Sequence, residues 1–249
     1  MSESIRGTIL YTSNQPHRTG EARGAEHFSI TRNADCTRSL RSHCVIQDPP
    51  MVERDVVLSV DERFHPRTAQ VRIRIGDDQE GAALFRFANN VIYSAGKTID
   101  GVVYDDVFES EEATSFFVTH PIQADAWLLA SLNTDEEPCV RRVENFPTCS
   151  IDHRGATGPR LAFHVSPIDI HFLGIERIQV MAGEFDAKHF CYGDPADNPE
   201  GANIDGQHPR YHVWTSADGD YILLRAQVDG YMQTHYELSE LVRGPAGSI

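Results

Sequence analysis

Residues 178–192 read IQVMAGEFDAKHFCY, and after a loop rich in Gly, Pro, Asp and Asn the chain continues with YHVWTS (211–216) and YILLRAQV (221–228). Ala-Asp-Gly-Asp at 217–220 and Asp-Gly at 229–230 separate the later runs. Asp-Gly pairs between β-rich runs are a strong local signal for hairpins. The stretch predicts a series of antiparallel strands that completes a β-sheet, and by itself it indicates no reaction.

Length and composition indicate an ordinary globular protein. The chain has 249 residues, of which 40% are hydrophobic and 24% charged, and it is long enough to bury a sizeable core. Its formal net charge is -15. Because so acidic a chain repels phosphate backbones, we expect no nucleic-acid partner.

The sequence also gives an expectation for location. Residues 1–6, MSESIR, lack the apolar core of a signal peptide. No run approaches the roughly 18 to 20 apolar residues of a membrane span. We therefore expect a cytoplasmic protein without a membrane partner. The five cysteines are odd in number and show no CxxC spacing, which predicts small hydrophobes or surface thiols rather than ligands or disulfides. They are Cys36, Cys44, Cys139, Cys149 and Cys191.

Alternation predicts most of the other strands. Val71, Ile73 and Ile75 alternate with arginines, which is the clearest period-two pattern in the chain. Residues 52–60 alternate in the same way. Runs that recur every 8 to 12 residues with turn signals between them favour a sandwich or a barrel, and we count about a dozen strands. The remaining predicted strands are 5–12, 27–32, 38–46, 83–87, 91–95, 102–110, 139–143, 161–166 and 231–241.

One short helix is predicted over residues 122–132, where apolar residues recur at helical spacing and neither Gly nor Pro intervenes. The region 114–132 divides the strands into two blocks, about 1–113 and about 133–249. We treat these blocks as one large β domain that spans residues 1–249. The predicted fold class is mainly β, an antiparallel barrel or strongly curved sheet with one helix.

Short motifs, mostly in residues 115–241, resemble a family of uncharacterised bacterial β-barrel proteins that are distantly similar to calycins, the lipocalin-like group. The resemblance implies an antiparallel barrel or half-open sheet around a cavity. It implies no reaction, and since some family members carry export signals, their location does not transfer. The motifs are His120-Pro121 with Asp125-Ala126-Trp127, Ala182-Gly183-Glu184-Phe185 with Ala187 and His189-Phe190, Val213-Trp214 before Asp218, Leu223-Leu224-Arg225, and Tyr236-Glu237-Leu238.

His189 is the first candidate for acid-base chemistry. Alternation with Phe185, Ala187 and Cys191 predicts that its side chain lies on the apolar face of a strand. An inward imidazole can act as a general base, since its ordinary pKa lies near neutrality. The alternative is a core histidine that is satisfied by a backbone carbonyl.

A second candidate group follows along the chain. His212 shares a strand face with Arg210 and Trp214, and Arg225 lies on the next predicted strand. In a cavity, the indole would stack on a substrate, an arginine would pair with an anionic group, and His212 would move a proton. If the face points to solvent, these are ordinary surface residues.

Three further residues complete the candidate set. Tyr104 shares a face with Val102 and Phe108, so a buried phenol could polarise a substrate, or it could be tethered to a backbone carbonyl. His120 and Asp125 flank the start of the predicted helix. They could form an acid-base pair at a cavity mouth that contacts substrate, or Asp125 could cap the helix.

The sequence favours no cofactor and no metal. It contains no GxGxxG, GxxxxGK[ST], GxSxG or SxxK motif, which disfavours nucleotide cofactors and serine-hydrolase chemistry. Seven residues separate His164 from His171, which is not a standard zinc spacing. A metal site assembled from distant segments stays open. The other residues that raise the question are Asp152, His153, Asp169 and Glu176.

Three functions are compatible with these residues. The first is a cofactor-independent isomerase, hydratase, dehydratase or lyase that acts on a small apolar or aromatic metabolite in a barrel cavity. In that hypothesis His189, His212 and Tyr104 act on the substrate. The second is a non-catalytic carrier or sensor of a hydrophobic ligand. The third is a structural protein that assembles through its sheet, and the partner would then be a second copy in a homodimer.

Overall fold

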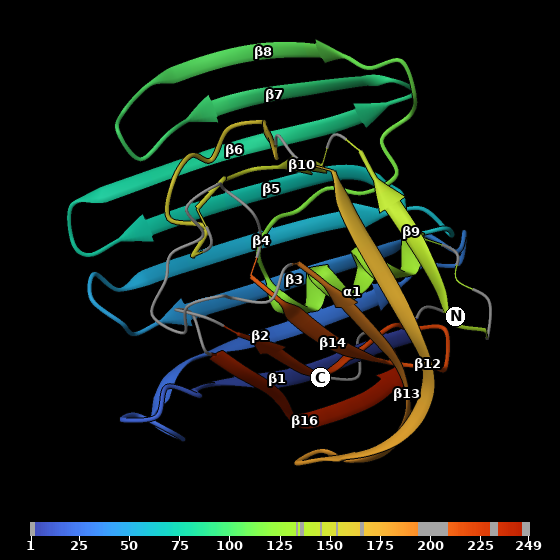
Figure 1. The fold of residues 1–249 in the computed structure, drawn as a ribbon. Coiled ribbons are helices and arrows are strands. Elements are labelled where there is room, and N and C mark those ends of the chain that lie inside the picture. The colour runs from blue at the N-terminus through green and yellow to red at the C-terminus, as the bar shows by residue number, and fades with distance from the viewer. Residues whose placement is uncertain are drawn as a thin grey trace.

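Strands dominate the computed structural model, which describes residues 3–132, 134, 137–144, 146–152, 154–164, 167–193, 209–229 and 234–245. Within this part of the chain there are sixteen strands and one helix (Figure 1). In chain order they are β1 (Glu3–Ser13), β2 (Ala22–Arg32), β3 (Arg38–Ile46), β4 (Val52–Val60), β5 (Pro66–Ile75), β6 (Gln79–Ala88), β7 (Val91–Lys97), β8 (Val103–Glu109), α1 (Ile122–Ser131), β9 (Cys139–Val143), β10 (Phe146–Thr148), β11 (Ala162–His164), β12 (Ile168–Val180), β13 (Gly183–Tyr192), β14 (Tyr211–Ser216), β15 (Leu223–Val228) and β16 (Thr234–Pro245).

Fourteen strands form one antiparallel sheet in the order β8-β7-β6-β5-β4-β3-β2-β1-β16-β15-β14-β13-β12-β9. The first and last strands of the chain, β1 and β16, pair at its middle. Strands β8 and β9 form the two edges, so the sheet of the described residues is not closed. The prediction of a mainly β, antiparallel and barrel-like protein with one helix is confirmed.

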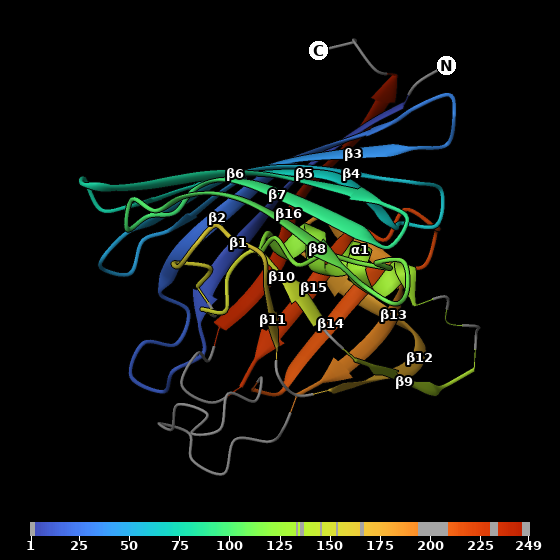
Figure 2. The ribbon, with the colours of Figure 1, turned by 90° about the horizontal axis from the view of Figure 1, so that it is seen from above.

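The sheet bends around the helix. Seen from above in Figure 2, β3 to β8 form a gently twisted wall, and β12 to β14 lie across from it with α1 between the two. The remaining strands, β10 and β11, form a separate pair. No helix among the described residues combines the length and apolar character that a bilayer crossing requires.

The alternating patterns place the core as predicted. Val71 and Ile73 on β5 are 1% and 0% exposed, while Arg72 between them is exposed and pairs with Asp55 and Glu80. The prediction failed for β12, of which only the end after residue 178 was recognised. Its register shifts at a bulge between Phe172 and Gly174, and such a shift breaks a regular alternation.

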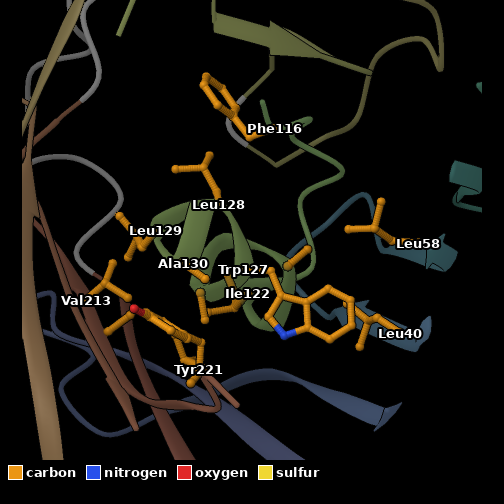
Figure 3. Close-up of a cluster of buried hydrophobic side chains, with 14 of the residues drawn as sticks. Leu40, Leu58, Phe116, Ile122, Trp127, Leu128, Leu129, Ala130, Val213 and Tyr221 are labelled. Carbon is orange, nitrogen blue, oxygen red and sulfur yellow. The ribbon is translucent and has the colours of Figure 1, made fainter. Parts of the chain in front are cut away.

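Helix α1 fills the space between the two sides of the sheet. In Figure 3 its Trp127 points toward Leu40 and Leu58 of the wall, while Leu129 lies beside Val213. Trp127 and Leu129 are both 1% exposed. Burial of each such side chain contributes about 2 kcal/mol or more. This packing makes the helix the centre of the core rather than a cover over a sheet face.

Candidate functional site

His189 lies on the outer face of β13, so the prediction that it shares the core face is wrong. The register sets His189 opposite Trp214, and Phe190 opposite Val213. Phe190 and Val213 are 0% exposed, and Val213 lies beside α1 (Figure 3). Successive side chains of a strand point to opposite faces, so His189 and Trp214 project away from the helix. The charged Lys188 occupies an inward position next to Phe190, which obscured the core face in the sequence.

A chain of hydrogen bonds links four side chains on this outer face. Nδ1 of His189 lies 3.0 Å from Oε1 of Glu176 on β12. Nε2 of His189 lies 3.0 Å from Nδ1 of His212 on β14, and Nε2 of His212 lies 3.6 Å from Sγ of Cys191. An ionised carboxylate only accepts, so the consistent assignment has His189 donating to Glu176, His212 to His189, and the thiol to His212. These four residues are named the histidine relay below.

Trp214 holds the relay in place. Its Nε1–H donates to Oε1 of Glu176 at 2.7 Å. Its ring is stacked on His189, with ring centres 4.1 Å apart and 19° between the planes. The predicted role of Trp214 was to stack on a substrate, yet His189 already covers one indole face. Trp214 therefore orients both the carboxylate and the first imidazole.

The two imidazoles in the middle of the histidine relay, His189 and His212, are uncharged at neutral pH. Burial lowers the pKa of His189, an effect that the charge of Glu176 opposes. Burial also lowers the pKa of His212 and raises the pKa of the Cys191 thiol. At neutral pH the relay therefore rests with two neutral imidazoles and a protonated thiol. A neutral imidazole is the form that accepts a proton.

Two arginines that were predicted to bind an anion flank the relay. The charge of Arg210 lowers the pKa of His212 and of Cys191. Arg225 on β15 donates from Nη2 to the carbonyl oxygen of Gln179 at 2.6 Å, which fixes its guanidinium. The Nε atoms of both arginines are buried and have no hydrogen-bond partner within the described ranges. Arg210 thus brings a positive charge to the thiol end of the relay.

The other three candidates lie elsewhere in the fold. Tyr104 on β8 donates to the carbonyl oxygen of Pro159 at 2.6 Å, as the tethering alternative predicted. Nε2 of His120 lies 3.0 Å from the carbonyl oxygen of Ser150. Asp125 accepts a hydrogen bond from the Tyr211 hydroxyl at 3.2 Å inside the core. None of these hydrogen bonds joins His120 to Asp125, and none connects these residues to the relay.

The start of α1 is stabilised by a residue that the sequence did not suggest. Oε2 of Glu26 accepts a hydrogen bond from the backbone N–H of Ile122 at 2.7 Å, and Pro121 at the N-cap position provides no side-chain cap. The alternative that Asp125 caps the helix is therefore replaced by a cap from β2.

Sequence reasoning did not include two members of the relay among the candidate site residues: Cys191, which was named only as a neighbour of His189, and Glu176, which was named only in the metal question. Cys191 follows His189 by two residues on one strand, so their shared face was readable from the sequence. Glu176 was hidden because the strand before residue 178 was not recognised. It reaches His189 through the pairing of β12 with β13.

The sequence left open whether His, Asp and Glu residues from distant segments assemble a metal site. Within the described part of the chain, no three His, Cys, Asp or Glu side chains gather as a metal site would require. His153 and the side chain of His164 lie outside the described residues.

Two hollows lie away from the relay. One, of about 740 Å³, is on the outer face of β2 to β7. Asp55 in this hollow pairs with both His43 at 2.8 Å and Arg72 at 3.0 Å. The other, named the edge cleft, has a volume of about 650 Å³ and lies between the ends of β8 and β9. Its lining includes the apolar Ile92, Phe108, Phe116, Leu132, Val143 and Phe163 and the acidic Glu109, Glu111, Glu112 and Glu144.

Comparisons with known proteins support the fold alone. No family model and no curated protein matches the sequence. Among solved structures, the chain is similar to a β-barrel-like protein of the domain of unknown function DUF1849 from Brucella abortus. The TM-score is 0.53, the identity is 8%, and the match covers 97% of this chain and 98% of that one. A putative lipoprotein from Parabacteroides distasonis matches with a TM-score of 0.29 and 10% identity over 95% of each chain, which is too low to carry an argument.

Proposed function

We propose that the protein is a cofactor-independent enzyme that uses acid-base chemistry at the histidine relay. The observation that supports this is the continuous series of hydrogen bonds from Glu176 through His189 and His212 to Cys191. A carboxylate, an imidazole and a second imidazole in sequence can move a proton to and from a substrate without a metal or a nucleotide. The site is the outer face of β12 to β14, because α1 occupies the interior.

In this proposal His212 is the group that exchanges a proton with the substrate. Its Nε2 lies at the end of the two-imidazole chain, and its lowered pKa keeps it neutral and able to accept. His189 and Glu176 are positioning residues, since they fix the tautomer of His212 and stabilise its charge when it gains a proton. Arg210 binds an anionic group of the substrate. The reaction class is isomerisation, hydration, dehydration or elimination on a small apolar or aromatic acid.

The test is a turnover screen on small aromatic and terpenoid carboxylic acids, followed by measurements on His189→Ala, His212→Ala and Glu176→Gln. We expect His212→Ala to lower kcat about 100-fold or more and Glu176→Gln to cause a smaller loss with a shifted pH profile. The matched control is His43→Ala, because His43 forms a histidine-carboxylate pair with Asp55 on another part of the outer face. Full activity in both His189→Ala and His212→Ala would refute the assignment.

The edge cleft favours a second candidate function, a carrier of a small hydrophobic ligand. Apolar and polar residues line it in about equal share, which suits a ligand with an apolar body and a charged head, and its volume of about 650 Å³ falls in the range of small-molecule sites. Native mass spectrometry with fatty acids and alkyl amines tests this. A retained ligand that is lost in Phe116→Ser but not in His212→Ala would favour carriage over catalysis.

Three expectations from the sequence stay predictions beside this function. We propose a distant calycin-like relationship, which the barrel-like fold supports and which a solved structure with a closed calycin barrel in a close homologue would test. The cytoplasmic location and the pairing of two copies of the chain are the other two. Localisation of a tagged chain and analytical ultracentrifugation would test them.

A further inference from the structure

Cys191 is the one member of the histidine relay to which acid-base chemistry assigns no task. We propose that its thiol is a nucleophile that His212 activates for acyl transfer from small anionic esters or thioesters. This inference rests on the proposed function, because it uses the same relay, and it adds a covalent step and a substrate class.

The geometry orders the groups as a nucleophile, a base and two orienting groups. Sγ of Cys191 lies 3.6 Å from Nε2 of His212, and in the assignment above the thiol donates to this nitrogen. The other nitrogen of His212 donates to His189, which in turn donates to Glu176, so the acceptor lone pair of His212 is directed at sulfur. A nucleophile beside a base that a third group orients is the recurring arrangement of covalent catalysis.

The proposed reaction consumes only the ester or thioester and one water molecule. Nε2 of His212 takes the thiol proton as sulfur bonds to the carbonyl carbon of the ester. When the tetrahedral intermediate collapses, the bond to the leaving alcohol or thiol breaks, and His212 gives that leaving group its proton. Water then attacks the Cys191 thioester as His212 takes a proton from it, the bond between carbon and sulfur breaks, and His212 returns the proton to sulfur. The products are a carboxylic acid and the regenerated thiol.

Charge selects the substrate class. The thiol lies near Arg210, whose charge acts on both Cys191 and His212. The positive charge of Arg210 attracts a carboxylate on the acyl chain, whereas a neutral acyl chain gains nothing from it. The negative charge of Asp229 also acts on Cys191 and His212. It repels a substrate carboxylate, so the carboxylate should lie nearer to Arg210 than to Asp229.

The experiment follows acylation of the full chain with two probes, mono(4-nitrophenyl) succinate and 4-nitrophenyl acetate. We expect a burst of nitrophenolate and a matching mass gain that peptide mapping assigns to Cys191, with the succinate probe about tenfold faster. Cys191→Ala should abolish the adduct. Glu176→Gln should slow acylation and shift its pH profile, and Arg210→Gln should remove the preference for the anionic probe.

The exposed Cys36 and the half-buried Cys139 serve as internal controls in the same molecule. Acylation of Cys191 no faster than that of Cys36, or an acylation rate at Cys191 that Glu176→Gln leaves unchanged, would overturn the inference. If no adduct forms and Cys191→Ala keeps acid-base turnover on a substrate from the screen, the nucleophile is rejected and the proposed function stands. If the native protein forms no adduct and turns over no acid in the screen, both are rejected.

Discussion

Asp125 shows how burial of one carboxyl group couples stability to pH. It lies on α1 inside the core, and burial raises its pKa from the ordinary 3.8 to about 7, although the Tyr211 hydrogen bond opposes the shift. The unfolded chain releases this proton near pH 4, whereas the folded protein holds it until about pH 7. The contribution of Asp125 to the free energy of unfolding therefore falls as the pH rises through that window.

We expect Asp125→Asn to stabilise the protein above pH 7 by up to about 4 kcal/mol and to have little effect near pH 4. The amide keeps an acceptor for Tyr211 and cannot ionise. Urea unfolding at pH 4.5 and pH 8 measures the difference. Asp77→Asn is the control, because the Asp77 side chain is 99% exposed. A variant that is less stable than the native protein at pH 8 would contradict this account.

The residues around His212 also show how much of the site could be predicted from the sequence. His212 and Trp214 share a face because they are two residues apart on one strand, and that part was predictable. The approach of His189 depends on the register of β13 against β14, which sets His189 directly opposite Trp214. Register depends on turns and bulges across the whole sheet, so no local pattern carries it.

The existence of helix α1 was predictable from the sequence, but its position in the fold was not. Residues 122–132 carry helical spacing, and α1 spans Ile122–Ser131. Its N-terminus, however, rests on Glu26, which lies about a hundred residues earlier on β2. Glu26 also accepts hydrogen bonds from Ser42 at 2.8 Å and Tyr11 at 3.1 Å. A cap supplied by a distant strand leaves no signal in the helix sequence.

We expect Glu26→Ala to lower the free energy of unfolding by about 2 to 4 kcal/mol. The substitution leaves the N–H of Ile122 and the hydroxyls of Ser42 and Tyr11 without their acceptor in a buried site. Glu26→Gln keeps an acceptor and should cost less, since burial also raises the pKa of the native carboxyl and makes its charge costly. Thermal unfolding of the two variants provides the measurement. Equal stability of Glu26→Ala and the native protein would show that the cap is dispensable.

For the whole molecule, the decisive contact joins the two ends of the chain. The pairing of β1 with β16 sets Ile9 opposite Leu238, and both are 0% exposed. The local alternation of each strand was readable, but it does not state which strand lies beside which. The sequence therefore predicted a barrel or curved sheet without revealing that its middle is made by its ends and its edges by β8 and β9.

Substitutions at the centre and at an edge of the sheet should therefore differ sharply. We expect Ile9→Ala to lower the free energy of unfolding by about 2 to 5 kcal/mol, because it opens a cavity where β1 meets β16. Val103→Ala, on the edge strand β8 and 78% exposed, should change it by about 0.5 kcal/mol or less. Urea titrations of both variants give the comparison. Equal losses would mean that β8 is covered in solution, by a second copy or a partner that extends the sheet, and that the open edge belongs to an interface.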